Sequence, residues 1–201
     1  MSRLLLVRHG DTELNSAERY WGHTNVELSA AGLRQAERLC DRLATEKINA
    51  IYSSDLLRAS VTAKIITSRH QLDVITCAEL QEINFGDAEG LTFDEISRLY
   101  PEVTKLWTGR SLKLKYPGGE SLDQFNSRIS KFLDRLEKHA AEETILIVAH
   151  SGVLRTLVCQ LLGIGLRYRW QFRLDFASLS IIETYPQGAV LSLLNDVSHL
   201  A

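Results

Sequence analysis

The sequence has no apolar run approaching the ~20 residues that a membrane-spanning helix requires. Its first residues also lack a signal-peptide pattern, because Arg3 precedes only four apolar residues. Neither sign of charge is in excess: 23 Lys and Arg stand against 25 Asp and Glu, a net charge of −2. That balance argues against nucleic acid or a membrane surface as the main partner. We therefore expect a cytoplasmic protein that acts on a small molecule.

Cysteine is scarce, with only Cys40, Cys77 and Cys159 in the chain. An odd number of cysteines in apolar surroundings fits reduced thiols in a core better than a disulfide framework. The sequence also lacks a His-Glu-x-x-His motif, a paired-cysteine motif and a Gly-x-x-x-x-Gly-Lys phosphate loop. We accordingly expect no metal and no other cofactor.

Short apolar runs alternate with helical patterns along most of the chain. Strands are predicted at 4–7, 48–54, 72–76, 144–149, 179–184 and 190–194, the last two as a hairpin. Helices are predicted after a cap at Ser29, after a cap at Ser54 or Asp55, and over 92–99, 101–107, 121–142 and 153–162. The second helix should turn Leu57, Val61 and Ile65 to the core. This order predicts an α/β protein of one domain, 1–201, with a lid-like insertion at about 80–120.

Charged residues follow three of the predicted strands. Arg8 and His9 follow the first, Arg58 comes soon after the second, and His150 follows the strand at 144–149. If these strands are parallel, their carboxyl ends share one edge of the sheet, where open α/β sheets bind ligands. Two histidines and two arginines would then converge at that edge.

A neutral imidazole beside two guanidinium groups suits phosphoryl transfer. Imidazole is a good nucleophile, and its ordinary pKa of about 6.5 leaves a usable neutral fraction. Arg8 and Arg58 oppose a second positive charge and should hold His9 deprotonated. The same guanidinium groups can bind phosphoryl oxygens and offset their charge, with His150 as a further donor.

Other residues are candidates for contacts to the phosphoryl group or to the rest of the substrate. The amides of Ser151 and Gly152 begin a helix, and helix N-termini bind anions. The polar loop at 11–28 supplies the remaining candidates: Asn15, Trp21, Gly22 and His23.

A leaving alkoxide needs a proton, and Glu82 is the candidate general acid. The spacing alone leaves Glu79 and Glu89 as alternatives. A phosphate dianion beside such a carboxyl group favours its protonated form. Once ionised, the same group could activate water for the second half of the reaction.

These motifs together resemble the histidine phosphatase superfamily, the phosphoglycerate-mutase-like proteins. The resemblance is carried in order by Arg8-His9-Gly10 with Thr12 and Asn15, Ser53-Ser54 with Arg58-Ala59, Glu82, Phe85-Gly86, Glu89-Gly90 and His150-Ser151-Gly152. It implies a three-layer α-β-α sandwich with a mainly parallel central sheet flanked by helices on both faces. It also implies a phosphatase whose His9 is transiently phosphorylated, and it favours Glu82 over its two neighbours.

Within the superfamily, residues 117–121, the compact length and residues 194–200 are most similar to α-ribazole phosphatases and related broad-specificity phosphatases. The expected partner is therefore a small phosphomonoester such as α-ribazole 5′-phosphate, and a homodimer is left open. Phosphoglycerate mutase activity is one alternative, although the resemblance implies that dedicated mutases carry a longer middle insertion. A non-catalytic phosphate-binding protein is the other.

Overall fold

The computed structural model of the protein describes residues 2–14 and 19–201. Its sheet has the strand order β3-β2-β4-β1-β5-β6. The strands are β1 Ser2–Arg8, β2 Ala50–Ser53, β3 Val74–Thr76, β4 Thr144–Ala149, β5 Leu179–Tyr185 and β6 Gly188–Asp196. β3, β2, β4 and β1 run parallel, and the β5–β6 hairpin adds two antiparallel strands beside β1. The predicted strands and the hairpin are thereby confirmed, with ends that differ by a few residues.

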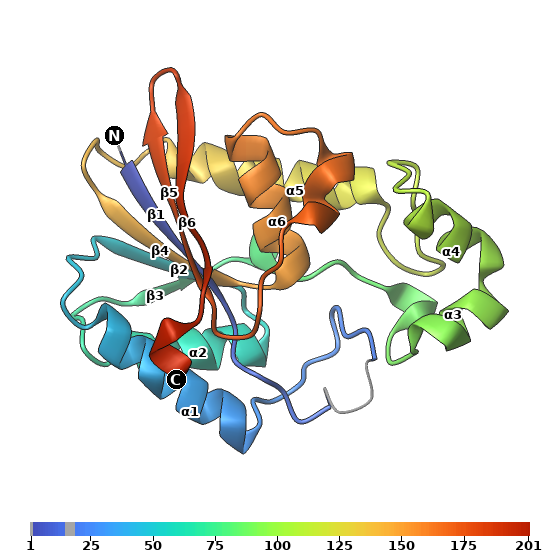
Figure 1. Ribbon diagram of the computed structural model, residues 1–201, viewed down its shortest axis with the longest axis horizontal. Helices are drawn as coiled ribbons and strands as arrows, with labels where there is room; N and C mark the ends of the chain where they lie inside the picture. Colours follow the sequence, from blue (N-terminus) through green and yellow to red (C-terminus); the bar gives the residue numbers. More distant parts are fainter. Residues whose placement is uncertain (1, 15–18) are drawn as a thin grey trace.

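Helices cover both faces of this sheet, as Figure 1 shows. They are α1 Ala30–Leu43, α2 Leu57–Thr67, α3 Phe93–Leu99, α4 Pro101–Thr108, α5 Leu122–Leu136 and α6 Ser151–Leu161. The side chains of β1 alternate between two cores: Leu5 and Val7 pack with α1 and α2, whereas Leu4 and Leu6 pack with α5 and α6. A strand buried on both faces is what four consecutive apolar residues predict. The three-layer α-β-α sandwich is confirmed.

The start of α1 fixes the exit of β1. Ser29 caps the helix as predicted, because its hydroxyl accepts a hydrogen bond from the amide of Gly32. A Cβ on Gly10 would lie 2.5 Å from the carbonyl oxygen of Gly32, so glycine allows these two backbones to touch. This contact holds the end of β1, and with it His9, against the first turn of α1.

The prediction for α2 was wrong in two respects. Neither Ser54 nor Asp55 caps it: the amide of Leu57 donates instead to the side-chain carbonyl of Asn25 at 2.7 Å. The buried face carries Arg58, Ala59, Ser60, Thr62, Ala63 and Ile66, whereas Leu57 is 38% exposed. Backbone carbonyls hold the Arg58 side chain in the interior, so the face of α2 that carries Arg58 is the buried one. The apolar periodicity could not predict this, because it counts only apolar residues.

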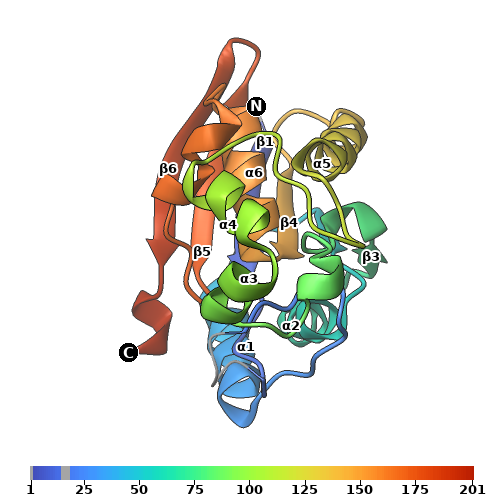
Figure 2. The same ribbon diagram turned by 90° about the vertical axis from the view of Figure 1, so that its right-hand side faces the viewer.

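The segment at about 80–120 forms two 3₁₀ turns, Ala78–Leu80 and Gly86–Ala88, followed by α3 and α4 near their predicted positions. In Figure 2 these two helices lie in front of the sheet, on the side toward which β1 and β4 run. Trp107 of α4 packs on Tyr20, Phe85 and Tyr116, with ring centroids 4.8 to 6.3 Å apart. An aromatic cluster therefore joins this segment to the body of the protein.

The three cysteines, Cys40, Cys77 and Cys159, are all free and buried, which confirms their interpretation as thiols in the core. α5 ends at Leu136, six residues before its predicted end at 142. No helix in the described ranges combines the length and apolar content needed to cross a bilayer.

Candidate active site

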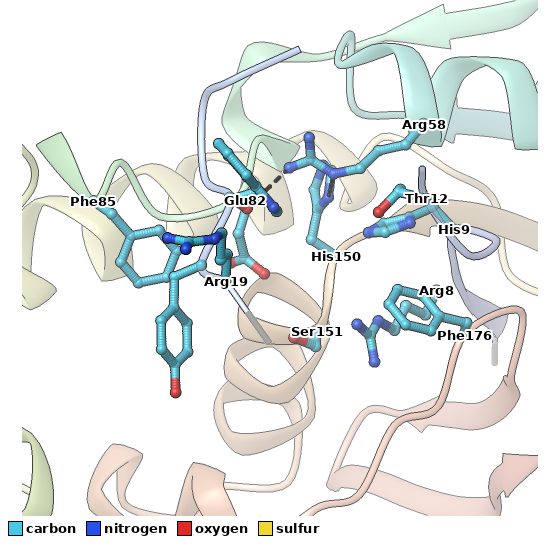
Figure 3. A pocket seen from close by; sticks show the side chains of 12 residues that line it. Arg8, His9, Thr12, Arg19, Arg58, Glu82, Phe85, His150, Ser151 and Phe176 are labelled. Atoms are coloured by element: carbon cyan, nitrogen blue, oxygen red, sulfur yellow. Dashed lines mark hydrogen bonds between the residues drawn. The ribbon is translucent and has the colours of Figure 1, made fainter. Parts of the chain in front are cut away.

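The carboxyl ends of β1, β2 and β4 meet at a cavity of about 360 Å³, shown in Figure 3. Its walls contain the five predicted catalytic side chains, Arg8, His9, Arg58, Glu82 and His150. Thr12, Arg19, Tyr20, Trp21, Phe85, Ser151 and Phe176 complete the lining. The predicted convergence at one sheet edge is therefore observed. The parallel pairing of these strands is its cause.

His9 follows directly after β1, and only 5% of it is exposed. Its Nδ1 lies 2.7 Å from the carbonyl oxygen of Gly10. A carbonyl only accepts hydrogen bonds, so Nδ1 carries the proton and Nε2 keeps a free electron pair. Burial, Arg58 and Arg8 together hold the pKa of His9 well below its ordinary value. The ring is thus a neutral imidazole with a fixed orientation and a free electron pair on Nε2.

Arg8 is the last residue of β1. Its Nη1 donates to the carbonyl of Leu174 at 2.7 Å, and its guanidinium lies 3.7 Å from the ring centroid of Phe176. Burial lowers the pKa of Arg8 to about 10, so it remains a cation at neutral pH. The buried Nε–H has no acceptor in the described part of the chain. An unpartnered buried donor costs about 1–3 kcal/mol, which an anionic oxygen bound beside it would offset.

Arg58 is 2% exposed, and backbone carbonyls hold it. Nη1 donates to Thr24 O at 2.9 Å, and Nη2 donates to Gly22 O at 2.7 Å and Trp21 O at 3.4 Å. Nε donates to Nδ1 of His150 at 3.1 Å. A guanidinium has five N–H donors, so these bonds leave one on Nη1 for an oxygen in the cavity.

His150 immediately follows β4 and is 1% exposed. Because its Nδ1 accepts from Arg58, the proton is on Nε2, which donates to the hydroxyl of Ser54 at 2.9 Å. Burial and the nearby Arg58 charge keep its pKa well below the ordinary value. The sequence predicted a donor to phosphoryl oxygens. In this structure both ring nitrogens form hydrogen bonds to protein groups, Nδ1 to Arg58 and Nε2 to Ser54. The prediction is therefore revised: His150 orients Arg58.

Glu82 lies across the cavity from His9, as Figure 3 shows, and is 8% exposed. Its carboxylate accepts from the amides of Ile83 at 3.0 Å and Gly152 at 2.9 Å, which places it on the first turn of α6. A Cβ at position 152 would lie 2.3 Å from Oε1, so only glycine allows this approach. The prediction that the Gly152 amide binds phosphate is therefore revised: that donor holds Glu82.

The predicted substrate contacts have different outcomes. Trp21 and Ser151 line the cavity. Gly22 and His23 are not part of its lining. Their backbone groups bind Glu89, and that of Gly22 also binds Arg58. Asn15 lies outside the described residues.

Sequence reasoning missed Phe176, whose ring centroid is 5.5 Å from His9 and which stacks on Arg8. It precedes β5, which pairs with β1, so strand order brings it to the site. A signal existed only in that pairing, since no local motif surrounds Phe176. Arg19, Tyr20 and Phe85 also line the cavity and were not assigned to it from the sequence, although Phe85 lies in one of the family motifs and the other two lie in the polar loop at 11–28.

A second, smaller cavity of about 120 Å³ adjoins the first and shares Tyr20, Glu82, Phe85 and Ser151 with it. Its other walls include the aromatic residues Trp107, Tyr116, Phe125 and Trp170 and the cations Arg155 and Arg169. Both guanidinium groups lie over the ring of Trp170, at 5.5 and 4.7 Å from its centroid. Flat aromatic and cationic surfaces thus lie beyond Glu82 as seen from His9.

The burial of His9 gives an expected titration. Its ring should stay neutral at pH values well below the ordinary histidine pKa of about 6.5. Burial and the charges of Arg58 and Arg8 disfavour the imidazolium. Histidine NMR resonances followed from pH 8 to pH 4.5, assigned with His9→Gln, measure this. Below about pH 6.5 the unfolded chain binds a proton on this histidine, whereas the folded protein does not. The contribution of His9 to the free energy of unfolding should therefore be complete above about pH 6.5 and decrease at lower pH. A midpoint near 6.5 for His9 would contradict the described environment.

Metal ligands do not cluster in this structure: the described residues contain no group of three or more His, Cys, Asp or Glu side chains arranged to hold an ion.

The chain is similar to known proteins over almost its whole length. A family model described as the histidine phosphatase superfamily (branch 1) matches residues 4–197. Phosphoserine phosphatase 1 of Hydrogenobacter thermophilus is 36% identical over 100% of this chain and 95% of that protein. The adenosylcobalamin/alpha-ribazole phosphatase of Escherichia coli (strain K12) is 33% identical over 96% of each chain. The crystal structure of the alpha-ribazole phosphatase from Shigella flexneri superimposes with a TM-score of 0.89 at 34% identity, covering 96% of each chain.

Proposed function

The chain belongs to the histidine phosphatase superfamily and is a phosphoric monoester hydrolase, and on that premise we propose that its reaction proceeds through a phosphoryl-histidine at His9. One observation carries the proposal: His9 is buried and neutral, and its Nδ1–H donates to Gly10 O, which leaves Nε2 as the only nucleophilic atom of the ring. Covalent catalysis replaces one difficult displacement by two easier ones.

In the first step Nε2 of His9 attacks the phosphorus atom and the bond to the alcohol oxygen breaks. Positive charge develops on the imidazole, and the hydrogen bond from Nδ1–H to Gly10 O strengthens as it does. Arg8 and Arg58 stabilise the equatorial oxygens as the bond order changes. Glu82 gives its proton to the departing alkoxide.

In the second step the ionised Glu82 takes a proton from water, whose oxygen attacks phosphorus. The N–P bond breaks, its electron pair returns to Nε2, and phosphate leaves with Glu82 protonated again. The amides of Ile83 and Gly152 hold the carboxyl group in one place through both steps.

For the leaving alcohol we propose an aromatic, nucleoside-like group, as in α-ribazole 5′-phosphate. The smaller cavity beyond Glu82 supports this, because aromatic side chains, Trp107 and Trp170 among them, line it and flat rings pack favourably on such side chains. Arg155 and Arg169 form no ion pair within the described residues, and planar guanidinium groups also stack on aromatic rings.

Phosphoserine is the second candidate, favoured by 36% identity over the whole chain to a phosphoserine phosphatase. Arg155 and Arg169 in the smaller cavity would repel its ammonium group and attract its carboxylate. Charge therefore does not separate the two candidates, and it is the aromatic lining that supports the first one.

A panel of monoesters tests both proposals: α-ribazole 5′-phosphate, O-phosphoserine, 3-phosphoglycerate and glucose 6-phosphate. We expect kcat/KM to be highest for α-ribazole 5′-phosphate, by about five-fold or more over phosphoserine, because ring stacking contributes about 1 kcal/mol or more. Trp107→Leu should remove most of that advantage and leave phosphoserine turnover nearly unchanged. Phe93→Leu is the matched control, since Phe93 packs on Trp107 outside the cavity.

Each other outcome of the panel supports a different function. Preference for phosphoserine that survives Trp107→Leu would support the second candidate. An isomer in place of free phosphate from 3-phosphoglycerate would support a mutase. Stoichiometric phosphate binding without turnover of any ester would indicate a non-catalytic phosphate-binding protein.

A further inference from the structure

The carboxylate of Glu89 is surrounded by backbone amides. Oε1 accepts from the amides of His23 at 2.9 Å, Gly22 at 3.1 Å and Phe85 at 3.2 Å. Oε2 accepts from Gly22 at 3.0 Å, and from the Thr24 amide at 3.3 Å and hydroxyl at 2.8 Å. Glu89 does not line the larger cavity. Four amides and one hydroxyl thus converge on one side chain just outside the site.

The same short loop faces Arg58 on its other side. While the amides of residues 22–24 point to Glu89, the carbonyls of Trp21, Gly22 and Thr24 accept from the Arg58 guanidinium. A Cβ at position 22 would lie 2.4 Å from Glu89 Oε1 and 2.0 Å from Ile83 O, so the loop sits directly on both. A peptide whose N–H binds an anion presents its C=O with greater partial negative charge. The loop therefore links the carboxylate to the guanidinium.

We propose that Glu89 is a positioning residue for phosphoryl transfer: by binding the amides of residues 22–24 it fixes the carbonyls that orient Arg58. This inference rests on the proposed function, in which Arg58 binds the phosphoryl group. Glu89 itself makes no contact with the reacting atoms, because protein donors surround both of its oxygens. Glu89 was an alternative to Glu82 as general acid on sequence spacing alone. The structure distinguishes them, because Glu82 lines the cavity and Glu89 does not.

The requirement is for a carboxylate, since only an ionised side chain offers acceptor sites on both oxygens to five donors. In Glu89→Gln one end of the side chain becomes an NH₂ group that faces backbone N–H groups. We expect the loop of residues 21–24 to shift and the Arg58 guanidinium to lose its orientation toward the cavity. The expected loss in kcat/KM is about 10- to 100-fold, as for other groups that hold a reactive side chain in place.

A double-mutant cycle with Arg58→Ala separates positioning from general stability. The cycle uses Glu89→Gln, Arg58→Ala and the double variant, with kcat/KM for p-nitrophenyl phosphate as the readout. If Glu89 acts through Arg58, its replacement has no further effect once Arg58 is absent. Losses that multiply, or full activity in Glu89→Gln, would overturn the inference. Absence of turnover and of a His9 adduct in the unmodified protein would instead reject the proposed function.

Two further variants complete the experiment. Glu46→Gln is the matched control. It removes a carboxylate that pairs with Arg3 at the start of β1, whereas the cavity lies at the end of that strand. Activity should be unchanged. If Glu89→Gln does not fold, Thr24→Val replaces it, because it removes only the hydroxyl donor to Oε2. A smaller loss that again disappears in the Arg58→Ala background is expected, and a loss that persists there would contradict the link.

Discussion

Replacing His9 by alanine should reduce kcat by at least ~10³-fold and abolish the covalent intermediate, because the variant has no other nucleophile in line with phosphorus. The neighbouring imidazole, His150, cannot take over, since Arg58 and Ser54 occupy its two nitrogens. Rapid quench into alkaline detergent and gel separation without acid, after mixing with ³²P-labelled ester, measures the phosphoryl adduct. With unlabelled ester, ³¹P NMR at alkaline pH measures the same adduct. The unmodified protein should show an acid-labile adduct in amounts up to one per chain.

The controls for this experiment separate loss of the nucleophile from loss of the fold. His70→Ala removes a histidine that is not part of the cavity lining, and both the adduct and turnover should persist. Binding of inorganic phosphate to His9→Ala should also persist, because Arg8 and Arg58 remain. An adduct that still forms in His9→Ala would reject the proposed mechanism.

The sequence was sufficient to predict the residues that depend on strand ends. Arg8, His9 and His150 each follow a recognisable apolar run directly, and the parallel sheet then brings them together. The information is local, because a strand's end and the next residue are adjacent in the chain. The family resemblance added the choice of Glu82, which the structure places in the same cavity.

The partners of these residues could not be predicted from local patterns. The carbonyls that hold Arg58 come from residues 21–24, more than 30 positions earlier, so a buried arginine in α2 had no visible acceptor. For that reason the apolar positions Leu57, Val61 and Ile65 were wrongly assigned to the core face. Likewise, the Gly152 amide was assigned to phosphate because its acceptor, Glu82, is 70 residues away.

Glu82→Gln should lower kcat by about 10²- to 10⁴-fold for alkyl phosphates, because glutamine cannot donate a proton to the leaving oxygen. Glutamine keeps the shape of the side chain but only one of the two acceptors for the amides of Ile83 and Gly152, so one hydrogen bond is lost. Inhibition by inorganic phosphate should still change little, because Arg8 and Arg58 remain to bind it. The measurement is kcat and the phosphate inhibition constant for one alkyl ester and for p-nitrophenyl phosphate.

The choice of leaving group makes this prediction specific to proton donation. p-Nitrophenolate leaves without protonation at neutral pH, so Glu82→Gln should slow formation of its phosphoryl-histidine much less than that of an alkyl ester. Glu79→Gln is the matched control, because its carboxylate pairs with Arg135 at 2.6 Å outside the cavity. An equal loss of intermediate formation for both esters would mean that Glu82 orients the substrate without protonating it. Equal effects of the two replacements would remove Glu82 from the reaction, since only one of these carboxylates faces His9 across the cavity.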